Sequence, residues 1–232
     1  MSAWKRWALF GGIAAILVAV VGPFVYFQFI EGDPPPPLSI TDTSTTTAPG
    51  ALPTAAPTSL DGTWTVTAGS TAGYRVKETL FGQSGTAVGR TTAVTGHVTL
   101  AGATVGTASF SVDLTKVTSN QSIRDSQFQG RIMDTAQFPT ATFELTTPID
   151  LGRVPASGVK ITPRATGRLT VHGTTKTVTV PLDAVRTGSG IQVDGSIPIT
   201  FADYDISNPS GGPASVGDTG TLEFLLVLSR TA

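Results

Sequence analysis

Cysteine is absent from the 232-residue sequence, and charged residues make up only 13% of it. The lack of cysteine excludes disulfides, thiol nucleophiles and thiolate metal ligands. Only two histidines are present, and neither has an acidic cluster beside it in the sequence, which argues against a metal site. A chain of this length nevertheless buries enough apolar surface to fold without disulfides.

An excess of charge of either sign is missing from residues 60–232. Four lysines and nine arginines face thirteen acidic residues there, so the formal charge is zero. A protein that binds nucleic acid needs a basic patch that releases counterions, whereas these basic residues are scattered singly along the sequence. We therefore expect no nucleic acid among the partners.

Catalytic motifs are missing as well. The sequence contains no Gly-x-Ser-x-Gly turn, no phosphate-binding glycine-rich loop before a helix and no zinc-protease helix. Arg124 and Asp125 are charged neighbours, but adjacent residues on a helix point in different directions, which favours a helix cap for Asp125 and an ion pair for Arg124. His97 falls on the solvent side of its strand, and His172 lies in a turn. We expect neither an enzyme nor a cofactor.

A charge-free, largely apolar run, residues 7–30, follows Lys5 and Arg6. As a helix it would be roughly 36 Å long at ~1.5 Å per residue, which is enough to cross a bilayer. The run is longer than the apolar core of a cleaved signal peptide, which favours an uncleaved anchor over that alternative. The basic residues before it place the N-terminus in the cytoplasm. We predict residues 1–30 as a cytoplasmic tip and single-pass anchor in the cell membrane, with the C-terminal domain extracytoplasmic.

Residues 31–59 are rich in proline, serine and threonine and contain four consecutive prolines at 34–37. Such a composition cannot build a core and favours an extended, partly polyproline II linker. We predict a stalk that lifts the following domain off the membrane. Attachment of O-linked sugars to this stalk is a further hypothesis that its composition supports.

Residues 60–232 alternate between large apolar and polar side chains with a period of two, the pattern of strands that have one wet face. Phe110, Val112 and Leu114, for example, are separated by a serine and an aspartate. Turn residues such as those at 171–174 separate roughly eight to ten strands. Because closure removes the edges of such a sheet, we predict an all-β fold, an extended antiparallel barrel of about eight strands; a sandwich of two sheets is the alternative.

One stretch, residues 119–143, interrupts the alternation. Ser122 and Asp125 have the spacing of a capping box, which predicts a short helix beginning at Ser122. The apolar positions spaced about one turn apart along it are Ile123, Phe128 and Ile132. We expect the helix to lie across one end of the barrel, and this helix and the loop at 80–82 to flank an entrance.

Three motifs stand out in residues 60–232. They are Asp61-Gly62-Thr63-Trp64, residues 119–143 with Arg124-Asp125 and Phe138-Pro139-Thr140-Ala141-Thr142-Phe143, and residues 167–176, which begin Gly-Arg-Leu-Thr-Val-His-Gly. In this order they resemble the YceI-like polyisoprenoid-binding family. The resemblance implies a lipocalin-like barrel whose elongated interior holds a long isoprenoid or a similar acyl chain, with a short helix near the mouth. Glu78 departs from the family, because many members have a histidine there.

Inward-facing side chains would contact such a ligand if the barrel is hollow. Small residues on the inward side leave room beside the phenylalanines: Gly96, Ala108, Ala141, Gly167 and Gly195. The ligand-binding residues that we predict are Tyr74, Val76, Phe110, Val112, Phe128, Phe143, Leu169, Val171, Phe201 and Phe224. The alternative for each of them is an ordinary place in a packed core.

The sequence therefore predicts a membrane-anchored extracytoplasmic protein that sequesters or carries an isoprenoid lipid or a quinone in its barrel. Apolar burial, at about 25 cal/mol per Å² removed from water, would drive the tail of such a ligand inside. The alternative is a surface interaction module with a solidly packed barrel. Its loops, such as residues 203–218, would then bind a protein or a polysaccharide.

Overall fold

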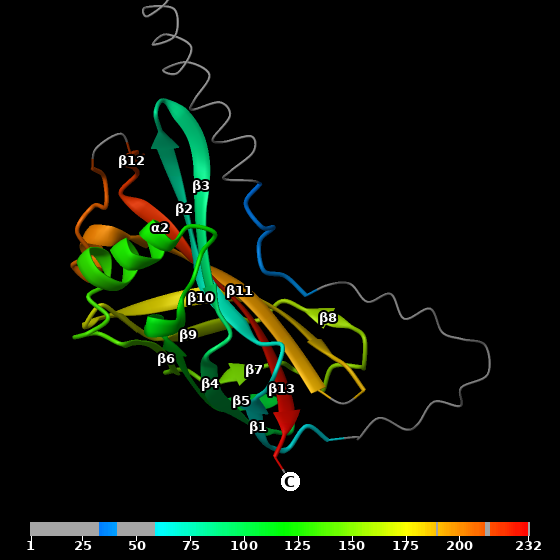
Figure 1. Cartoon of the computed structure of the whole chain (residues 1–232). Helices are drawn as coiled ribbons and strands as arrows, with labels where there is room; N and C mark the ends of the chain where they lie inside the picture. Colours follow the sequence, from blue (N-terminus) through cyan, green and yellow to red (C-terminus); the bar gives the residue numbers. More distant parts are fainter. Residues whose placement is uncertain (1–32, 41–58, 189, 212–213, 232) are drawn as a thin grey trace, which may run out of the picture.

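The computed structural model of the chain describes residues 33–40, 59–188, 190–211 and 214–231. Its strands form one continuous antiparallel sheet that curls into a barrel (Figure 1). This confirms the predicted barrel and rules out two separate sheets. The predicted membrane anchor lies outside the described residues, and within them no helix is both long and apolar enough to cross a membrane.

Eight strands close the barrel, in the order β1-β4-β5-β6-β9-β10-β11-β13, and β13 pairs back with β1. Further strands, β2, β3, β7, β8 and β12, extend its walls. The bounds are β1 Gly62–Val66, β2 Thr71–Leu80, β3 Gln83–Thr91, β4 Val94–Ala101, β5 Thr104–Asp113, β6 Thr140–Leu145, β7 Ile149–Asp150, β8 Lys160–Ile161, β9 Arg164–Val171, β10 Thr174–Arg186, β11 Gly190–Thr200, β12 Ala214–Val216 and β13 Thr219–Arg230.

Strand β13 divides its pairing between two neighbours. Its last part pairs with β1, where Leu228 faces Val66, whereas its first part pairs with β2, where Leu222 faces Tyr74. The hairpin of β2 and β3 therefore continues the barrel wall beyond the closed part. Its tip is the two-residue turn Phe81-Gly82, and both residues have positive φ angles.

A short helix, α2 (Ser122–Gln127), continues into a wider turn, η3 (Phe128–Ile132), and confirms the helix predicted in this stretch. The predicted capping box is wrong. The residue before the helix is Gln121, whose side chain makes no capping hydrogen bond. Asp125 instead accepts hydrogen bonds from the backbone N–H and hydroxyl of Ser119, at 2.7 and 2.6 Å, because the chain bends back toward the helix before it begins.

The helix lies over one end of the barrel (Figure 1), as expected. The one-turn helices η2 (Leu114–Lys116) and η4 (Phe201–Tyr204) follow β5 and β11. Both of these strands run toward the end where α2 lies. A large core cluster that includes Phe128, Met133 and Tyr204 fills the space beneath α2. We call this end of the barrel the helix end.

The opposite end, which we call the far end, holds a second apolar cluster. Leu60, Trp64 and Leu228 are buried there together with Val98 and Leu100. The indole Nε1–H of Trp64 donates a hydrogen bond of 2.9 Å to the carbonyl of Leu60, so the polar atom of this buried ring is satisfied. This cluster holds the chain that leads into β1 across the barrel base.

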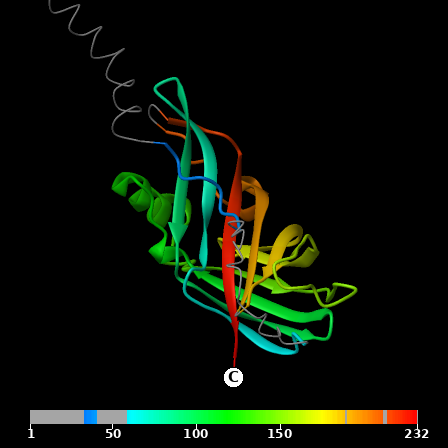
Figure 2. The ribbon, with the colours of Figure 1, turned by 90° about the vertical axis from the view of Figure 1, so that its right-hand side faces the viewer.

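Residues 33–40 contain no helix or strand, yet they lie along the outside of the barrel (Figures 1 and 2). The Nη2 atom of Arg75 donates to the carbonyl of Pro35 at 2.7 Å, and the N–H of Ile40 donates to Asp194 at 3.0 Å. The composition of this segment predicted part of a stalk, and its packing on the barrel is a finding of the structure. Prolines cannot donate backbone hydrogen bonds, but their carbonyls accept from arginine, and composition alone does not reveal such partners.

Candidate functional site

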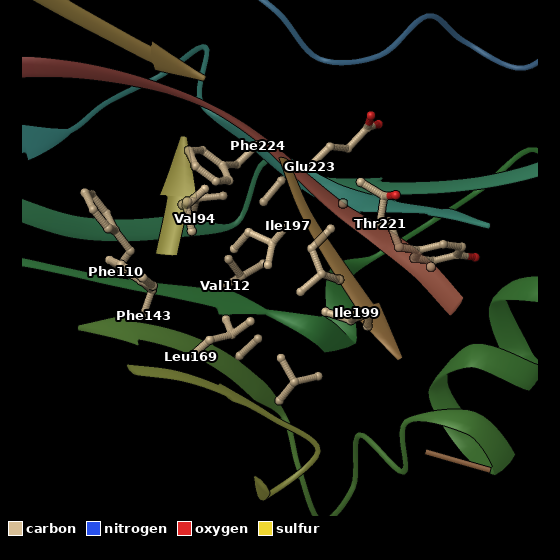
Figure 3. A pocket seen from close by; sticks show the side chains of 18 of the residues that line it. Val94, Phe110, Val112, Phe143, Leu169, Ile197, Ile199, Thr221, Glu223 and Phe224 are labelled. Atoms are coloured by element: carbon tan, nitrogen blue, oxygen red, sulfur yellow. The ribbon is translucent and has the colours of Figure 1, made fainter. Parts of the chain in front are cut away.

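A cavity of about 840 Å³ runs through the inside of the barrel. Along β13 its lining residues extend from Gly220 to Leu228, which corresponds to roughly 26 Å at ~3.3 Å per residue. Figure 3 shows aliphatic and aromatic side chains from several strands around this space. The labelled side chains that line it include Val94, Phe110, Val112, Phe143, Leu169, Ile197, Ile199 and Phe224. The barrel is therefore hollow, and its interior is apolar.

Glycines opposite phenylalanines keep the space open. Gly195 of β11 is paired with Phe224 of β13, and Gly96 of β4 is paired with Phe110 of β5. A Cβ atom on Gly195 would stand only 2.6 Å from Cζ of Phe224. The aromatic ring therefore lies over the glycine, against the barrel wall. The small residues that the sequence placed on the inward side make room for rings beside the cavity.

The cavity opens at the helix end. Among its lining residues the exposed ones are Ile123, Gln127, Arg131 and Gly211. The first three belong to α2 and η3, and Gly211 precedes β12, so all four lie at this end of the barrel. Leu80, next to the hairpin tip, also lines the cavity. We call this opening the mouth; the predicted placement of the helix and of the loop at 80–82 beside an entrance agrees with it.

Polar groups gather at the mouth. Arg124 donates from Nη2 to Glu78 Oε1 at 2.7 Å and from Nη1 to Asn120 Oδ1 at 2.6 Å. The ion pair joins α2 to β2, and both side chains are largely shielded from solvent. The predicted ion pair for Arg124 is thus present, and Gln127 and Arg131 face water. Arg131 donates from Nε to Gln127 at 3.0 Å.

Tyr74 and Phe128 stack beneath this ion pair, with ring centroids 5.0 Å apart. The stack connects β2 to η3 and forms the wall just inside the mouth. The pKa of Tyr74 is raised to about 12, chiefly by burial; the guanidinium of Arg124 opposes this rise, whereas the carboxylates of Asp125 and Glu78 contribute to it. The tyrosine is therefore neutral over the whole physiological range.

All ten residues predicted as ligand-binding line the cavity. Tyr74, Val76 and Phe128 lie near the mouth, and the others come from β5, β6, β9, η4 and β13. They are Phe110, Val112, Phe143, Leu169, Val171, Phe201 and Phe224. Contact of any of them with a ligand stays a prediction.

Other residues that line the cavity were not among the ten predicted ones. Val94, Ile197 and Ile199 have the same inward parity as the chosen ones, so the alternation already contained the signal for them. Glu78 and Arg124 carried no such signal, because they are 46 positions apart in the sequence and no local pattern predicts their contact. Only the closure of the barrel places α2 above β2.

The two histidines have the environments that the sequence predicted. His97 is exposed on β4. His172 lies in the turn between β9 and β10, where its Nδ1 is 3.2 Å from the carbonyl oxygen of Tyr204 and its ring meets Phe138 edge-on. No group of three or more histidine, aspartate or glutamate side chains within the described residues is arranged to hold a metal ion.

A closed antiparallel barrel with an apolar interior, open at one end beneath a short helix, defines a lipocalin-like binding protein. The particular family follows from comparison with known domains. The family model described as the YceI-like domain matches residues 64–228, so the chain belongs to the YceI-like family. The resemblance found in the sequence is thereby confirmed.

Solved structures share the fold. A polyisoprenoid binding domain from Saccharophagus degradans, implicated in plant cell wall breakdown, is 20% identical with a TM-score of 0.60; the match covers 73% of this chain and 99% of that domain. BcnA of Burkholderia cenocepacia is 24% identical with a TM-score of 0.54, over 70% of this chain and 98% of BcnA. No curated protein matches the chain.

Proposed function

We propose that this protein binds a long hydrophobic chain, an isoprenoid lipid or the tail of a quinone, inside its barrel. The observation that carries the proposal is the apolar cavity of about 840 Å³, which opens at the mouth and reaches the buried apolar cluster at the far end. A volume of this size lies at the upper end of the range of roughly 300–1,000 Å³ that small-molecule sites occupy. Its narrow, elongated shape suits a slender tail better than a compact ligand.

The polarity of the lining sets the orientation of the ligand in this proposal. Each 100 Å² of apolar tail that leaves water contributes roughly 2.5 kcal/mol, which favours the deep, apolar part of the cavity for the tail. The polar side chains of Glu78, Arg124 and Gln127 at the mouth then lie beside the head group. The polyisoprenoid binding domain of Saccharophagus degradans, which has the same fold, supports an isoprenoid as the ligand class.

The proposed cellular place follows from the sequence. Residues 1–30 anchor the chain in the cell membrane with a cytoplasmic N-terminus. Residues 31–59 link this anchor to residues 60–232, which form the extracytoplasmic binding domain. The protein then sequesters or carries a lipid next to the membrane that supplies or receives it. No catalytic step and no cofactor is part of this proposal.

A surface interaction module was the alternative, and it required a solidly packed barrel. The hollow interior removes the reason for preferring that alternative. Its proposed binding loop, residues 203–218, partly forms η4 and β12 at the helix end of the barrel. This loop therefore contributes to the surroundings of the mouth.

Native mass spectrometry tests the binding proposal. The chain from residue 33 onward, which retains both the barrel and the segment packed on it, would be purified from its own host without detergent. We expect a stoichiometric adduct, and organic extraction should release an isoprenoid or a quinone. A clean apo mass that stays clean after incubation with polyprenyl lipids would contradict the proposal and favour the interaction module.

A further inference from the structure

Residues 33–40, which we call the strap, are held to the barrel along their length. Arg75 donates to the carbonyl of Pro35 at 2.7 Å, and Arg90 donates to the carbonyl of Pro36. The N–H of Leu38 donates to Glu223 at 3.4 Å. Glu223 points away from the cavity (Figure 3), yet only 4% of it is exposed, because it lies beneath the strap and between the two arginines.

The strap has a defined direction along the barrel. Its contacts begin at Arg75 of β2 and end at Asp194 of β11. In the sheet register Arg75 pairs with Thr221 and Asp194 with Leu225, which is four residues farther from the helix end. The chain therefore runs from the helix end toward the far end, so its first described residues lie on the mouth side (Figure 1).

This direction limits which end of the barrel can reach a membrane. Between residue 30, the end of the proposed anchor, and Pro35 the chain spans at most about 18 Å. Along the strands, the tip of the β2–β3 hairpin lies roughly 20 Å beyond Arg75 on the mouth side, whereas the end of β13 lies roughly 30 Å away on the other side. The short tether brings the mouth, but not the far end, to the membrane.

Exposed apolar side chains occupy the same end. The large hydrophobic residues that stand out as exposed in the described part of the chain are Phe81 at 59%, Ile123 at 75% and Val159 at 50%. Phe81 forms the tip of the hairpin, and Ile123 is on α2 at the cavity opening. Only Val159 lies elsewhere, next to β8 at the far end. Phe81 and Ile123 thus flank the mouth on the two elements that border it.

The backbone at Phe81 points to a role outside folding. Its φ is 51° and that of Gly82 is 80°, the left-handed values of a type I′ turn. Asparagine or glycine normally occupies the first of these positions, and a bulky residue there is strained. An aromatic ring kept at a strained, exposed position stabilises neither the turn nor the core, so a contact outside this domain explains it better.

We propose that the mouth end of the barrel is a membrane-binding surface, in which Phe81 and Ile123 enter the lipid interface while the strap holds the barrel with its mouth toward the bilayer. This inference rests on the proposed membrane anchor in residues 1–30. Its consequence is that a hydrophobic ligand passes between bilayer and cavity without crossing water. The strap thereby leaves only residues 31–34 as a short tether between the proposed anchor and the first contact of the strap at Pro35.

The absence of cysteine from the sequence makes a direct test simple. Full-length chains with either Gln83→Cys, beside the hairpin tip, or Ala101→Cys, at the far-end terminus of β4, would carry a fluorescent dye. They would be reconstituted in phosphatidylcholine vesicles that contain doxyl-labelled phosphatidylcholine. We expect the doxyl lipid to quench the dye at position 83 and to leave the dye at position 101 unquenched.

A double variant and a control test the membrane contact of Phe81 and Ile123 independently of the fold. Phe81→Asn with Ile123→Ser should abolish quenching at position 83 and leave the fold intact, because Asn-Gly is a favoured pair for this turn. The matched control is Val159→Ser, which removes the exposed hydrophobic residue at the far end and should change nothing. Quenching that survives loss of both mouth residues would overturn their role.

A second pair of variants tests the strap. Arg75→Gln with Asp194→Ala removes partners of the strap on both sides of the buried Arg90–Glu223 pair, and it should reduce quenching at position 83. Arg168→Gln with Glu144→Ala breaks an exposed ion pair away from the strap and serves as the matched control. Unchanged quenching after the strap is weakened would show that it does not orient the barrel.

Flotation of the vesicles at alkaline pH distinguishes the two ways in which the inference can fail. Chains that float while position 83 is unquenched, or while position 101 is quenched, would overturn the orientation and leave the anchor standing. Chains that do not float would refute the anchor, and the orientation with it. Neither outcome changes the separate test of lipid binding by mass spectrometry.

Discussion

At the scale of single residues, the pairing of Gly195 with Phe224 decides how much room the cavity has. The nearest atoms that a Cβ on Gly195 would meet belong to the side chains of Phe224 and Leu182. Gly195→Ala should therefore push the ring into the cavity while the backbone stays in place. We expect ligand affinity to fall about tenfold, or ~1.4 kcal/mol, with a stability change of ~1 kcal/mol or less. Titration with a polyprenyl lipid and urea unfolding measure the two effects.

The matched control for this exchange is Gly106→Ala on β5. A Cβ there would meet Thr99 Oγ1 at 3.6 Å, an ordinary contact, so neither affinity nor stability should change appreciably. Equal affinity of the Gly195→Ala chain and the wild type would contradict the idea that the glycine holds the ring against the wall. Gly167 is a poorer choice for the test, because its Cβ would also meet the backbone carbonyl of Glu144.

Tyr74 gives a prediction about alkaline pH. Burial raises its pKa from 10.0 to about 12, so between these values the unfolded chain binds fewer protons than the folded one. The free energy of unfolding must then fall as the pH rises through this window, by up to about 1.4 kcal/mol per pH unit. Tyr74→Phe should show a shallower fall in urea-unfolding experiments, and the same pH dependence as the wild type below pH ~9. If the free energies of unfolding of the variant and the wild type changed in parallel over the whole pH range, the fall at alkaline pH would not come from Tyr74.

At the scale of elements, α2 is fastened over the mouth by the Arg124–Glu78 ion pair and by the stack of Tyr74 on Phe128. Glu78→Gln weakens the first of these contacts by ~1 kcal/mol. We expect ligand release to become about fivefold faster and the amides of α2 to exchange faster with solvent. Glu144→Gln, which breaks the exposed pair with Arg168, is the matched control. Unchanged release kinetics would mean that α2 does not control passage through the mouth.

The helix also shows where local sequence patterns fall short. Its position and the packing of Phe128 and Ile132 followed from spacing, whereas Ile123, the third apolar position, is 75% exposed. Its cap did not. The carboxylate of Asp125 binds Ser119, a partner that depends on how the preceding loop approaches, so the three-residue spacing from Ser122 misidentified the contact.

At the scale of the whole molecule, the length of the cavity should set the length of the ligand. Ala108 on β5 lies toward the far end and Ala141 on β6 toward the mouth. Ala108→Phe should abolish binding of long polyprenyl lipids but keep that of short prenyl alcohols, whereas Ala141→Phe should abolish both. Native mass spectrometry distinguishes these outcomes, and circular dichroism checks the fold, since overpacking typically costs ~1–3 kcal/mol. Equal effects of the two exchanges would contradict a ligand that enters through the mouth and extends along the barrel toward the far end.

The sequence by itself determined the closed antiparallel barrel and its inward residues, because a period of two assigns each side chain to one face whatever its neighbours are. All ten predicted residues accordingly line the cavity. Tertiary structure alone decided that the barrel is hollow, that its mouth lies under α2 and that the strap packs on Glu223. These features depend on contacts between residues far apart in the chain, such as the 185 positions between Leu38 and Glu223, and no local pattern encodes them.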